Sequence, residues 1–148
     1  MKRCYIFDID GTIANGEHRI HHIVNEHGKK DWDTYFSLCG DDEPIPHVIE
    51  LMQDLTRANC SIIIVSGRSD QVRQETQDWL EKHDIWYDRL VMRRQGDHRN
   101  DDILKVEMLE QLRAEGWVPI MAFDDRNRVV KAWRANGVPC AQVAEGDF

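Results

Sequence analysis

The chain has 148 residues, 41% of them hydrophobic and 31% charged, with a formal net charge of −8 at neutral pH. This length is typical of one domain, and the composition excludes collagen-like and low-complexity classes. The longest uncharged apolar run, residues 60–65, is too short to span a membrane and no secretory signal is visible, so we expect a cytoplasmic protein that does not contact membranes.

Short apolar segments alternate with longer amphipathic segments along the chain. The predicted elements, in chain order, are a strand at 4–7, a helix at 46–59, a strand at 61–65, a helix at 69–83, a strand at 90–92, a helix at 101–115, a strand at 119–123, a helix at 126–136 and a strand at 139–143. This alternation is typical of the α/β class. It predicts a doubly wound, Rossmann-like parallel sheet of five strands with helices on both faces.

Residues 14–44 do not follow the alternation of strands and helices. They separate the first predicted strand from the first predicted helix and contain a Lys-Lys pair and Trp32. Loops at the edge of a scaffold commonly shape binding sites. We therefore predict a small cap inserted after the first strand and folded over the carboxyl edge of the sheet. Because neither a linker nor an internal repeat is visible, residues 1–148 are predicted to form one domain.

Polar and charged side chains follow three of the predicted strands at the points where these strands end. Asp8 and Asp10 follow the first strand, residues 66–68 (Ser-Gly-Arg) follow the second, and Asp124 and Asp125 follow the fourth. The carboxyl ends of parallel strands meet at one edge of a sheet, so we expect these groups to lie close together. Four carboxylates in one crevice repel each other, and a hard cation such as Mg²⁺ relieves that repulsion.

The basic residues near these acids indicate an anionic ligand. Lys105 and Arg68 are predicted to face it, because ammonium and guanidinium groups both suit phosphate oxygens. Asp8 and Asp10 point to the same side of an extended chain, and Gly11 allows a sharp turn after them. One carboxylate of such a pair can attack phosphorus while the other protonates the leaving alkoxide and then deprotonates water. The pattern therefore predicts phosphoryl chemistry.

These segments, in this order, resemble the four motifs of the haloacid dehalogenase superfamily of phosphotransferases. The motifs are Asp8-Ile9-Asp10-Gly11-Thr12, Ser66-Gly67-Arg68, Lys105 and Asp124-Asp125. Residues 95–102 and the final segment 124–148 are further similar to the phosphatase domain of the bacteriophage polynucleotide kinase 3′-phosphatases. The resemblance extends over nearly the whole chain and is weakest over residues 20–42.

The resemblance implies roles for individual residues. Asp8 would be the nucleophile, Asp10 the general acid–base, and Lys105 a catalytic group that stabilises charge in the transition state. It also implies a Mg²⁺ site, whose ligands would be the backbone carbonyl of Asp10 and the carboxylates of Asp8, Asp124 and Asp125. The residues expected to bind phosphate or substrate are Thr12, Arg19, Ser66, Gly67, Arg68, Arg93, Asp101 and Arg126.

The expected reaction is removal of a phosphate, most specifically the 3′-phosphate of a polynucleotide end. A basic cluster over residues 93–99 suits contact with such an end. The alternative is a nucleotidase, deoxynucleotidase or other small-molecule phosphatase, which the net charge of −8 and the modest insertion favour. The phosphate-binding loop of the family's kinase half is not found in these residues. A phosphorylated nucleic-acid end and a nucleotide both remain candidate substrates, and a separate kinase or ligase partner remains open.

A phosphate-accepting signalling domain is a third reading from a different functional class. Receiver domains also carry acids, Mg²⁺ and Lys on a doubly wound sheet. In those domains, however, the acidic pair follows the first strand and the phosphorylated Asp follows a later one. The order here is reversed, and Asp10 is suited to hydrolyse an acyl-phosphate on Asp8, so we expect an enzyme.

Overall fold

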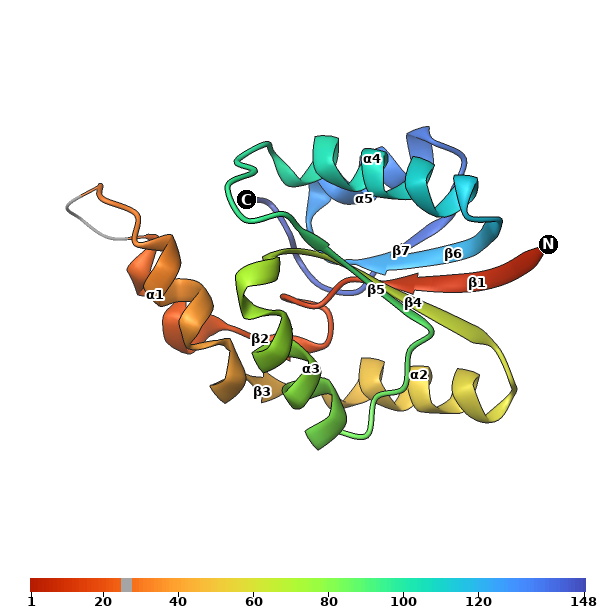
Figure 1. Ribbon diagram of the computed structural model, residues 1–148, viewed down its shortest axis with the longest axis horizontal. Helices are drawn as coiled ribbons and strands as arrows, with labels where there is room; N and C mark the ends of the chain where they lie inside the picture. The colour runs from red at the N-terminus through yellow and green to blue at the C-terminus, as the bar shows by residue number, and fades with distance from the viewer. Residues whose placement is uncertain (25–27) are drawn as a thin grey trace.

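The computed structural model describes residues 1–24 and 28–148, and it contains a five-stranded sheet in which every neighbouring pair of strands is parallel (Figure 1). The strand order is β5-β4-β1-β6-β7. The strands are β1 (Lys2–Phe7), β4 (Ser61–Ser69), β5 (Arg89–Arg93), β6 (Trp117–Asp124) and β7 (Cys140–Gln142). The predicted doubly wound sheet is confirmed.

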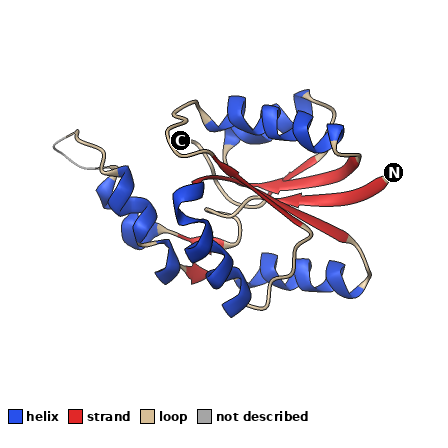
Figure 2. Cartoon of the chain, viewed as in Figure 1, coloured by secondary structure: helices blue, strands red, loops and turns tan. Residues whose placement is uncertain are grey.

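Helices cover both faces of the sheet (Figure 2). On one face lie α2 (Pro46–Arg57) and α3 (Arg73–Lys82), and on the other lie α4 (Asp101–Ala114) and α5 (Asn127–Ala135). Side chains of a strand point alternately to opposite faces, so each central strand contributes to two separate cores. In β1, Ile6 joins the core beneath α4 and α5, whereas Phe7 joins the core beneath α2 and α3.

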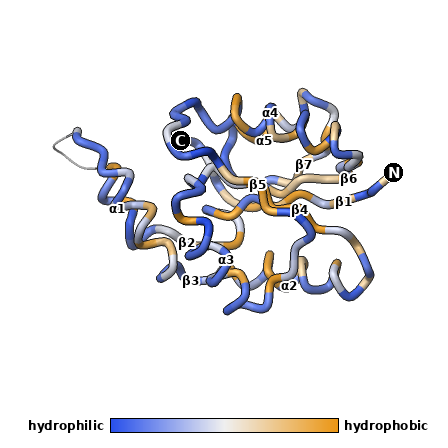
Figure 3. The backbone as a smooth tube through the Cα atoms, viewed as in Figure 1, coloured by the Kyte–Doolittle hydropathy of each residue, from blue (hydrophilic) through white to orange (hydrophobic). Residues whose placement is uncertain are grey.

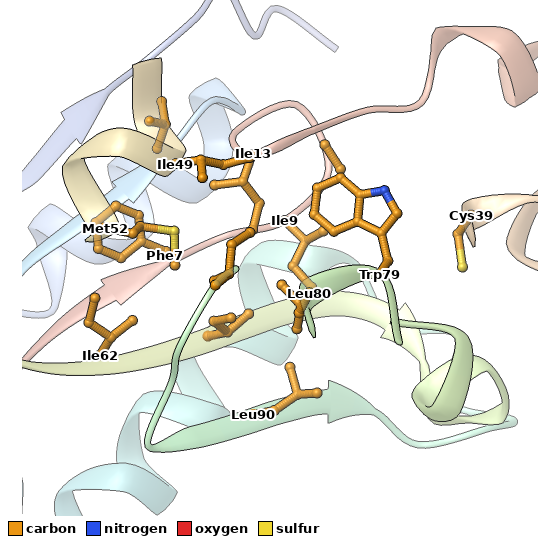
Figure 4. Packing of buried hydrophobic residues seen from close by; sticks show 14 of the residues in the cluster. Phe7, Ile9, Ile13, Cys39, Ile49, Met52, Ile62, Trp79, Leu80 and Leu90 are labelled. Carbon is orange, nitrogen blue, oxygen red and sulfur yellow. The ribbon is translucent and has the colours of Figure 1, made fainter. Parts of the chain in front are cut away.

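Part of the core beneath α2 and α3 is shown in Figure 4; this core includes Phe7, Ile62, Met52 and Trp79. Each of these side chains is at most 2% exposed. Full burial of a large apolar side chain contributes about 1.5–3 kcal/mol, so the two cores supply the main force that holds the helices on the sheet. Figure 3 shows largely hydrophobic strands, whereas the loop between β5 and α4 and the C-terminal segment are hydrophilic.

The predicted cap, residues 14–44, forms several short elements beside the carboxyl ends of the strands (Figure 1). These elements are β2 (Ala14–Asn15), the 3-10 helix η1 (Glu17–His22), α1 (Trp32–Ser37), the 3-10 helix η2 (Cys39–Asp41) and β3 (Glu43–Pro44). Strands β2 and β3 pair antiparallel and close the base of the insertion. Residues 25–27 of the predicted cap lie outside the described residues.

Strand β1 lies at the centre of the sheet, with β4 on one side and β6 on the other. The chain therefore reverses its direction of winding around β1. In open α/β sheets the crevice at such a reversal, beside the carboxyl ends of the strands, is where ligands bind. The turn after β1 and the last residues of β4 and β6 lie at this edge of the sheet. Among the described residues, the helices are all too short or too polar to cross a membrane.

Candidate active site

The loop after β1 is a tight turn anchored by two buried isoleucines. Ile9 and Ile13 are fully buried, and the carbonyl of Ile9 accepts a hydrogen bond from the Ile13 backbone N–H at 2.9 Å. Gly11 adopts φ +81°, a left-handed conformation that favours glycine. A Cβ atom at this position would lie only 2.1 Å from Asp125 Oδ2. The turn therefore brings its backbone against the carboxylate that follows β6.

Three carboxylates meet at the crevice. Oxygen atoms of Asp8, Asp124 and Asp125 lie within 4.8 Å of one another, and all three residues are buried. Thr12 Oγ1 lies 3.4 Å from Asp8 Oδ2 and 3.3 Å from Asp125 Oδ1, so its hydroxyl lies between these two side chains. Lys105 Nζ, from the second turn of α4, donates to Asp8 Oδ1 at 2.9 Å and to Asp124 Oδ2 at 2.8 Å.

The charges of this cluster perturb one another. Burial, and next the charge of Asp124, raises the pKa of Asp8 well above its ordinary value, although Lys105 opposes this rise. The same two causes raise the pKa of Asp125 to about 6. Burial lowers the pKa of Lys105, but the charges of Asp124 and Asp8 outweigh this effect, so its pKa lies above the ordinary value and it is cationic. One ammonium does not balance three carboxylates, and buried oxygen donors in this arrangement fit a hard divalent cation.

Asp124 is also tied to the start of α5. Its Oδ1 accepts hydrogen bonds from the backbone N–H groups of Asp125 at 2.8 Å and Arg126 at 3.3 Å. Its Oδ2 accepts from Trp133 Nε1 at 3.3 Å as well as from Lys105. The carboxylate therefore fixes the backbone of the two residues that precede α5 and faces the acidic cluster at the same time. A role in the local backbone turn and a role in the site coincide in this residue.

Asp10 faces a different set of partners from those of Asp8. Arg68 donates to Asp10 through Nη2 at 2.8 Å and through Nε at 3.1 Å, and Arg19 Nη2 donates at 2.7 Å. Burial raises the pKa of Asp10, but the charges and hydrogen bonds of Arg68 and Arg19 outweigh it and hold the pKa below its ordinary value. The Asp10 side chain is 30% exposed, so the carboxylate still reaches the crevice.

The structure places Arg68 and Arg19, the two arginines expected to bind phosphate or substrate, against two carboxylates. Both side chains are 0% exposed, and both bind Asp10 and Asp42. Arg68 Nη1 donates further to Thr76 Oγ1 at 3.2 Å, and Arg19 Nη1 donates to the Tyr35 carbonyl at 3.1 Å. Each guanidinium group therefore joins Asp10 to Asp42 in this structure.

Asp42 is the residue of the site that sequence reasoning missed. It is 4% exposed and lies between η2 and β3, at the end of the insertion. Its neighbours Asp41 and Glu43 are exposed, so the sequence shows three consecutive acids with nothing to mark the buried one. The available signal was the presence of Arg19 and Arg68 among the predicted site residues. Buried guanidinium groups require counter-charges, so two such arginines call for an acid in addition to Asp10.

A second group of the predicted residues gathers at the start of α4. Asp101, at the start of α4, pairs with both Arg93 and Arg126. The Gly67 carbonyl accepts from Arg93 Nε at 2.8 Å, and a Cβ at Gly67 would lie 2.6 Å from Asp101 Oδ1. Ser66 is fully buried, and its hydroxyl accepts a hydrogen bond from the backbone two residues further on. Asp101, Arg93, Arg126 and Gly67 therefore lie together, whereas Ser66 lies beside Arg68.

Residues 2–148 match the family described as the polynucleotide kinase PNKP phosphatase domain. A bifunctional polynucleotide kinase/RNA ligase of Autographa californica nuclear polyhedrosis virus is 31% identical over 139 residues, which cover 93% of this chain and 18% of the viral protein. A solved chain of the Pnkp1/Rnl/Hen1 complex is 30% identical with a TM-score of 0.84, covering 100% of this chain and 47% of that one. A second structure of these proteins, described as an RNA repair complex, has a TM-score of 0.83.

Other solved structures share the fold at lower identity. A class C acid phosphatase from Bacillus anthracis has a TM-score of 0.66 at 15% identity, with 97% of this chain and 68% of that one covered. The chain spans less than half of the length of the polynucleotide-processing relatives that it matches. Since the family match extends over almost every residue, this chain belongs to the PNKP phosphatase domain family and is a haloacid dehalogenase-type phosphatase domain, a phosphoric monoester hydrolase.

Proposed function

We propose that this chain hydrolyses phosphate monoesters through a covalent phosphoryl group on Asp8. The observation that carries the proposal is the position of Asp8 between Lys105 and two further carboxylates, with Asp10 beside it at the same turn. Phosphoryl transfer depends chiefly on positioning and on stabilising charge. Lys105 supplies a fixed positive charge next to the attacking oxygen. Residues 14–44 act as a small cap within a single phosphatase domain.

In the first step, one oxygen of the Asp8 carboxylate attacks phosphorus and the bond to the leaving oxygen breaks. Asp10 donates a proton to that leaving alkoxide. In the second step, Asp10 takes a proton from a water molecule, whose oxygen attacks the phosphorus bound to Asp8. Inorganic phosphate leaves and both carboxyl groups return to their starting states. Two aspartates thus divide the work of a nucleophile and of a proton carrier.

The first step requires a proton on Asp10, whereas Arg68 and Arg19 hold the pKa of Asp10 low in the free protein. A substrate phosphate brings up to two negative charges beside this carboxylate. Nearby like charge raises the pKa of a carboxyl group, so substrate binding favours the protonated form. Arg68 and Arg19 keep hydrogen bonds to Asp10 that fix its orientation.

The carboxylates of Asp8, Asp124 and Asp125, together with the backbone carbonyl of Asp10, are the proposed ligands for Mg²⁺. Carboxylate and carbonyl oxygens are the donors that this ion prefers. Burial, and next the charge of Asp124, raises the pKa values of Asp8 and Asp125, and a bound cation would offset both effects. When bound, the ion supplies charge neutralisation to the transferring phosphoryl group.

The proposed substrate is the 3′-phosphate of a polynucleotide end. Membership of the PNKP phosphatase family supports this choice, as do the names of the related proteins, which include an RNA repair complex and a polynucleotide kinase/RNA ligase. The name of the viral relative combines a polynucleotide kinase with an RNA ligase. A kinase or ligase, on a separate chain or on another part of a longer protein, is therefore the proposed partner of this domain.

A small-molecule nucleotidase is the second candidate, and the net charge of −8 favours it. An acidic protein repels an extended phosphate backbone, whereas a mononucleotide presents little charge beyond the reacting group. Arg93 and Arg126 both pair with Asp101, so neither offers an unpaired charge that favours one substrate over the other.

A substrate panel separates the two candidates. We expect Mg²⁺-dependent phosphate release from 3′-phosphorylated DNA or RNA oligonucleotides, with a higher kcat/KM than for 3′- or 5′-mononucleotides or for 5′-phosphorylated oligonucleotides. Asp8→Asn protein, prepared in parallel, controls for contaminating phosphatases. Hydrolysis of free nucleotides without release from the oligonucleotides would reject the polynucleotide proposal and favour the nucleotidase.

A further inference from the structure

We propose that Asp42, supplied by the insertion, is a positioning residue for Asp10 and acts through Arg19 and Arg68. The inference rests on the proposed function, because it takes Asp10 to be the group that moves the proton. It assigns to the insertion a part in the chemistry: the insertion provides the buried counter-charge that keeps Asp10 in its reactive orientation.

The four side chains form a closed ring of hydrogen bonds. Arg19 donates to Asp42 through Nε at 2.8 Å and through Nη2 at 2.7 Å, and the same Nη2 donates to Asp10 at 2.7 Å. Arg68 Nη2 donates to Asp10 at 2.8 Å and to Asp42 at 2.9 Å. Each arginine therefore bridges the same two carboxylates. Neither guanidinium can turn away from Asp42 without also losing its geometry toward Asp10.

Solvent exposure distinguishes Asp10 from the other three side chains of the ring. The side chains of Asp42, Arg19 and Arg68 are 0% exposed, whereas that of Asp10 is 30% exposed. Two arginines and two aspartates make the ring electrically neutral. Loss of the charge on Asp42 would leave two buried guanidinium groups with one carboxylate between them. An uncompensated buried charge is unfavourable, so the arginines would move toward water or toward other acceptors and Asp10 would move with them.

Asp42 is itself held firmly from several directions. His18 Nε2 lies 2.7 Å from Asp42 Oδ1, and Trp79 Nε1, from α3, donates to the Asp42 carbonyl at 2.8 Å. The Arg19 guanidinium also lies 4.3 Å from the centre of the Tyr35 ring of α1. A planar guanidinium group that makes two hydrogen bonds and also packs on an aromatic side chain has little freedom to move. The hydrogen-bonded ring of four side chains therefore fixes the position of Asp10 relative to the insertion as well as to the sheet.

The test compares substrates whose leaving groups differ in their need for a proton. A 3′-phosphorylated oligonucleotide releases an alkoxide and requires the proton from Asp10, whereas an aryl phosphate such as para-nitrophenyl phosphate releases a stable phenolate. In the Asp42→Asn variant, which keeps the shape and removes the charge, we expect kcat on the oligonucleotide to fall about 100-fold, the loss typical of a displacement near 1 Å. The first turnover with the aryl phosphate should stay close to the wild-type rate.

The second step also needs Asp10, so slow hydrolysis of the phosphoryl-enzyme should follow that first turnover. We therefore expect Asp42→Asn to release one phenolate per active site in a rapid burst and then to turn over slowly, which is the kinetic fingerprint of an accumulating covalent intermediate. The burst amplitude counts folded active sites, so rates per site do not depend on how much protein has folded. Asp41→Asn is the matched control, since Asp41 is the exposed neighbour with the same charge, and it should behave as the wild type.

A second variant, at the arginine that bridges Asp42 and Asp10, keeps the inference testable if Asp42→Asn does not fold. Arg19→Lys keeps the positive charge but removes the planar fork that joins Asp42 to Asp10. It should show the same burst and the same selective loss on the oligonucleotide. Wild-type turnover of the oligonucleotide in either variant, or an equal loss on both substrates without a burst, would overturn the inference.

Asp10→Asn separates this inference from the proposed function. If Asp10→Asn shows the burst and Asp42→Asn does not, Asp10 is the proton carrier and Asp42 does not position it. If Asp10→Asn turns over the oligonucleotide normally, the role proposed for Asp10 is wrong and the inference falls with it. The inference is supported when both variants show the same signature and Asp41→Asn does not.

Discussion

The ammonium of Lys105 lies 2.9 Å from Asp8 Oδ1, and this contact ties α4 to the turn after β1. The same nitrogen lies 2.8 Å from Asp124 Oδ2, so one side chain joins the carboxyl ends of two different strands. Both contacts are buried, where opposite charges interact more strongly than in water. Lys105 therefore offsets part of the repulsion in the acidic cluster while leaving the site net negative for a cation.

Replacement of Lys105 should destabilise the protein as well as inactivate it. Lys105→Met removes one partner of a buried ion pair, a change that typically costs about 3–5 kcal/mol of unfolding free energy. Urea denaturation in the presence of a chelator measures this loss, and saturating Mg²⁺ should recover part of it by neutralising the same carboxylates. Lys131→Met, on the exposed side of α5, is the control and should leave stability nearly unchanged. Equal stability of the two variants would contradict the role assigned to Lys105.

Replacement of Asp8 should separate activity from stability. Asp8→Asn removes the attacking oxygen and should abolish turnover. The melting temperature of the metal-free protein should stay the same or rise, because the change relieves both the burial of a charge and the repulsion from Asp124. Steady-state assays and thermal unfolding check the two halves of this prediction. Residual turnover above the level of contaminants, or a marked fall in melting temperature, would count against it.

The stability of the metal-free protein should fall as the pH rises from about 4 to above 6. The pKa of Asp125 is about 6 in the folded protein and 3.8 ordinarily, and that of Asp8 is raised in the same direction. Between these values the folded state binds more protons than the unfolded state, so increasing pH favours unfolding. The loss from Asp125 alone is on the order of 3 kcal/mol, since one pKa unit corresponds to about 1.4 kcal/mol. Asp10, whose pKa is lowered, contributes stability that is lost only in more acidic solution.

Urea denaturation across this pH range, with a chelator and with saturating Mg²⁺, measures the effect. Metal binding requires the deprotonated carboxylates, so Mg²⁺ should become more stabilising as the pH rises and should offset the loss. A pH dependence that is identical with and without Mg²⁺ would show that these carboxylates do not hold the ion.

The close approach of Gly11 to Asp125 predicts a selective effect of a single methyl group. Gly11→Ala incurs the strain of a positive φ, about 1–2 kcal/mol, and also places Cβ 2.1 Å from Asp125 Oδ2. Gly96→Ala is the matched control, because Gly96 has φ +88° but no heavy atom within 4 Å of the added Cβ. Both variants should lose stability, and only Gly11→Ala should lose most of its activity and its response to Mg²⁺. Similar activity in the two variants would contradict the proposed contact.

Much of the fold could be predicted from the sequence because local patterns and tertiary packing agree. The five apolar segments form the five strands, and the run at residues 62–65 lies in β4 with each residue fully buried. The turn after β1 and the last residues of β4 and β6 do converge, because the topology of a parallel sheet brings strand ends to one edge. Asp8, Lys105, Asp124 and Asp125 are brought together as that reasoning implies.

The partners of Asp10 could not be predicted, because they depend on how residues 14–44 fold. The motif around residues 66–68 suggests that Arg68 is available to an anion, but Asp42 competes for its guanidinium from a segment that no periodic pattern describes. Asp42, Arg19 and Arg68 are brought together by packing between distant segments. Charge pairing of this kind leaves no spacing signature in a single sequence, whereas strand ends and helix starts do.

The identity of the residue that accepts the phosphoryl group tests the account most directly. The Asp10→Asn variant, mixed with an aryl phosphate and Mg²⁺ and quenched in acid, should retain one phosphoryl group per chain because it hydrolyses the intermediate slowly. Borohydride reduction of the acyl-phosphate followed by peptide mass spectrometry locates it. We predict that the modified residue is Asp8 and that the Asp8→Asn/Asp10→Asn double variant remains unlabelled. Burst release of the phenol with the phosphoryl group on another residue, or on none, would contradict the account.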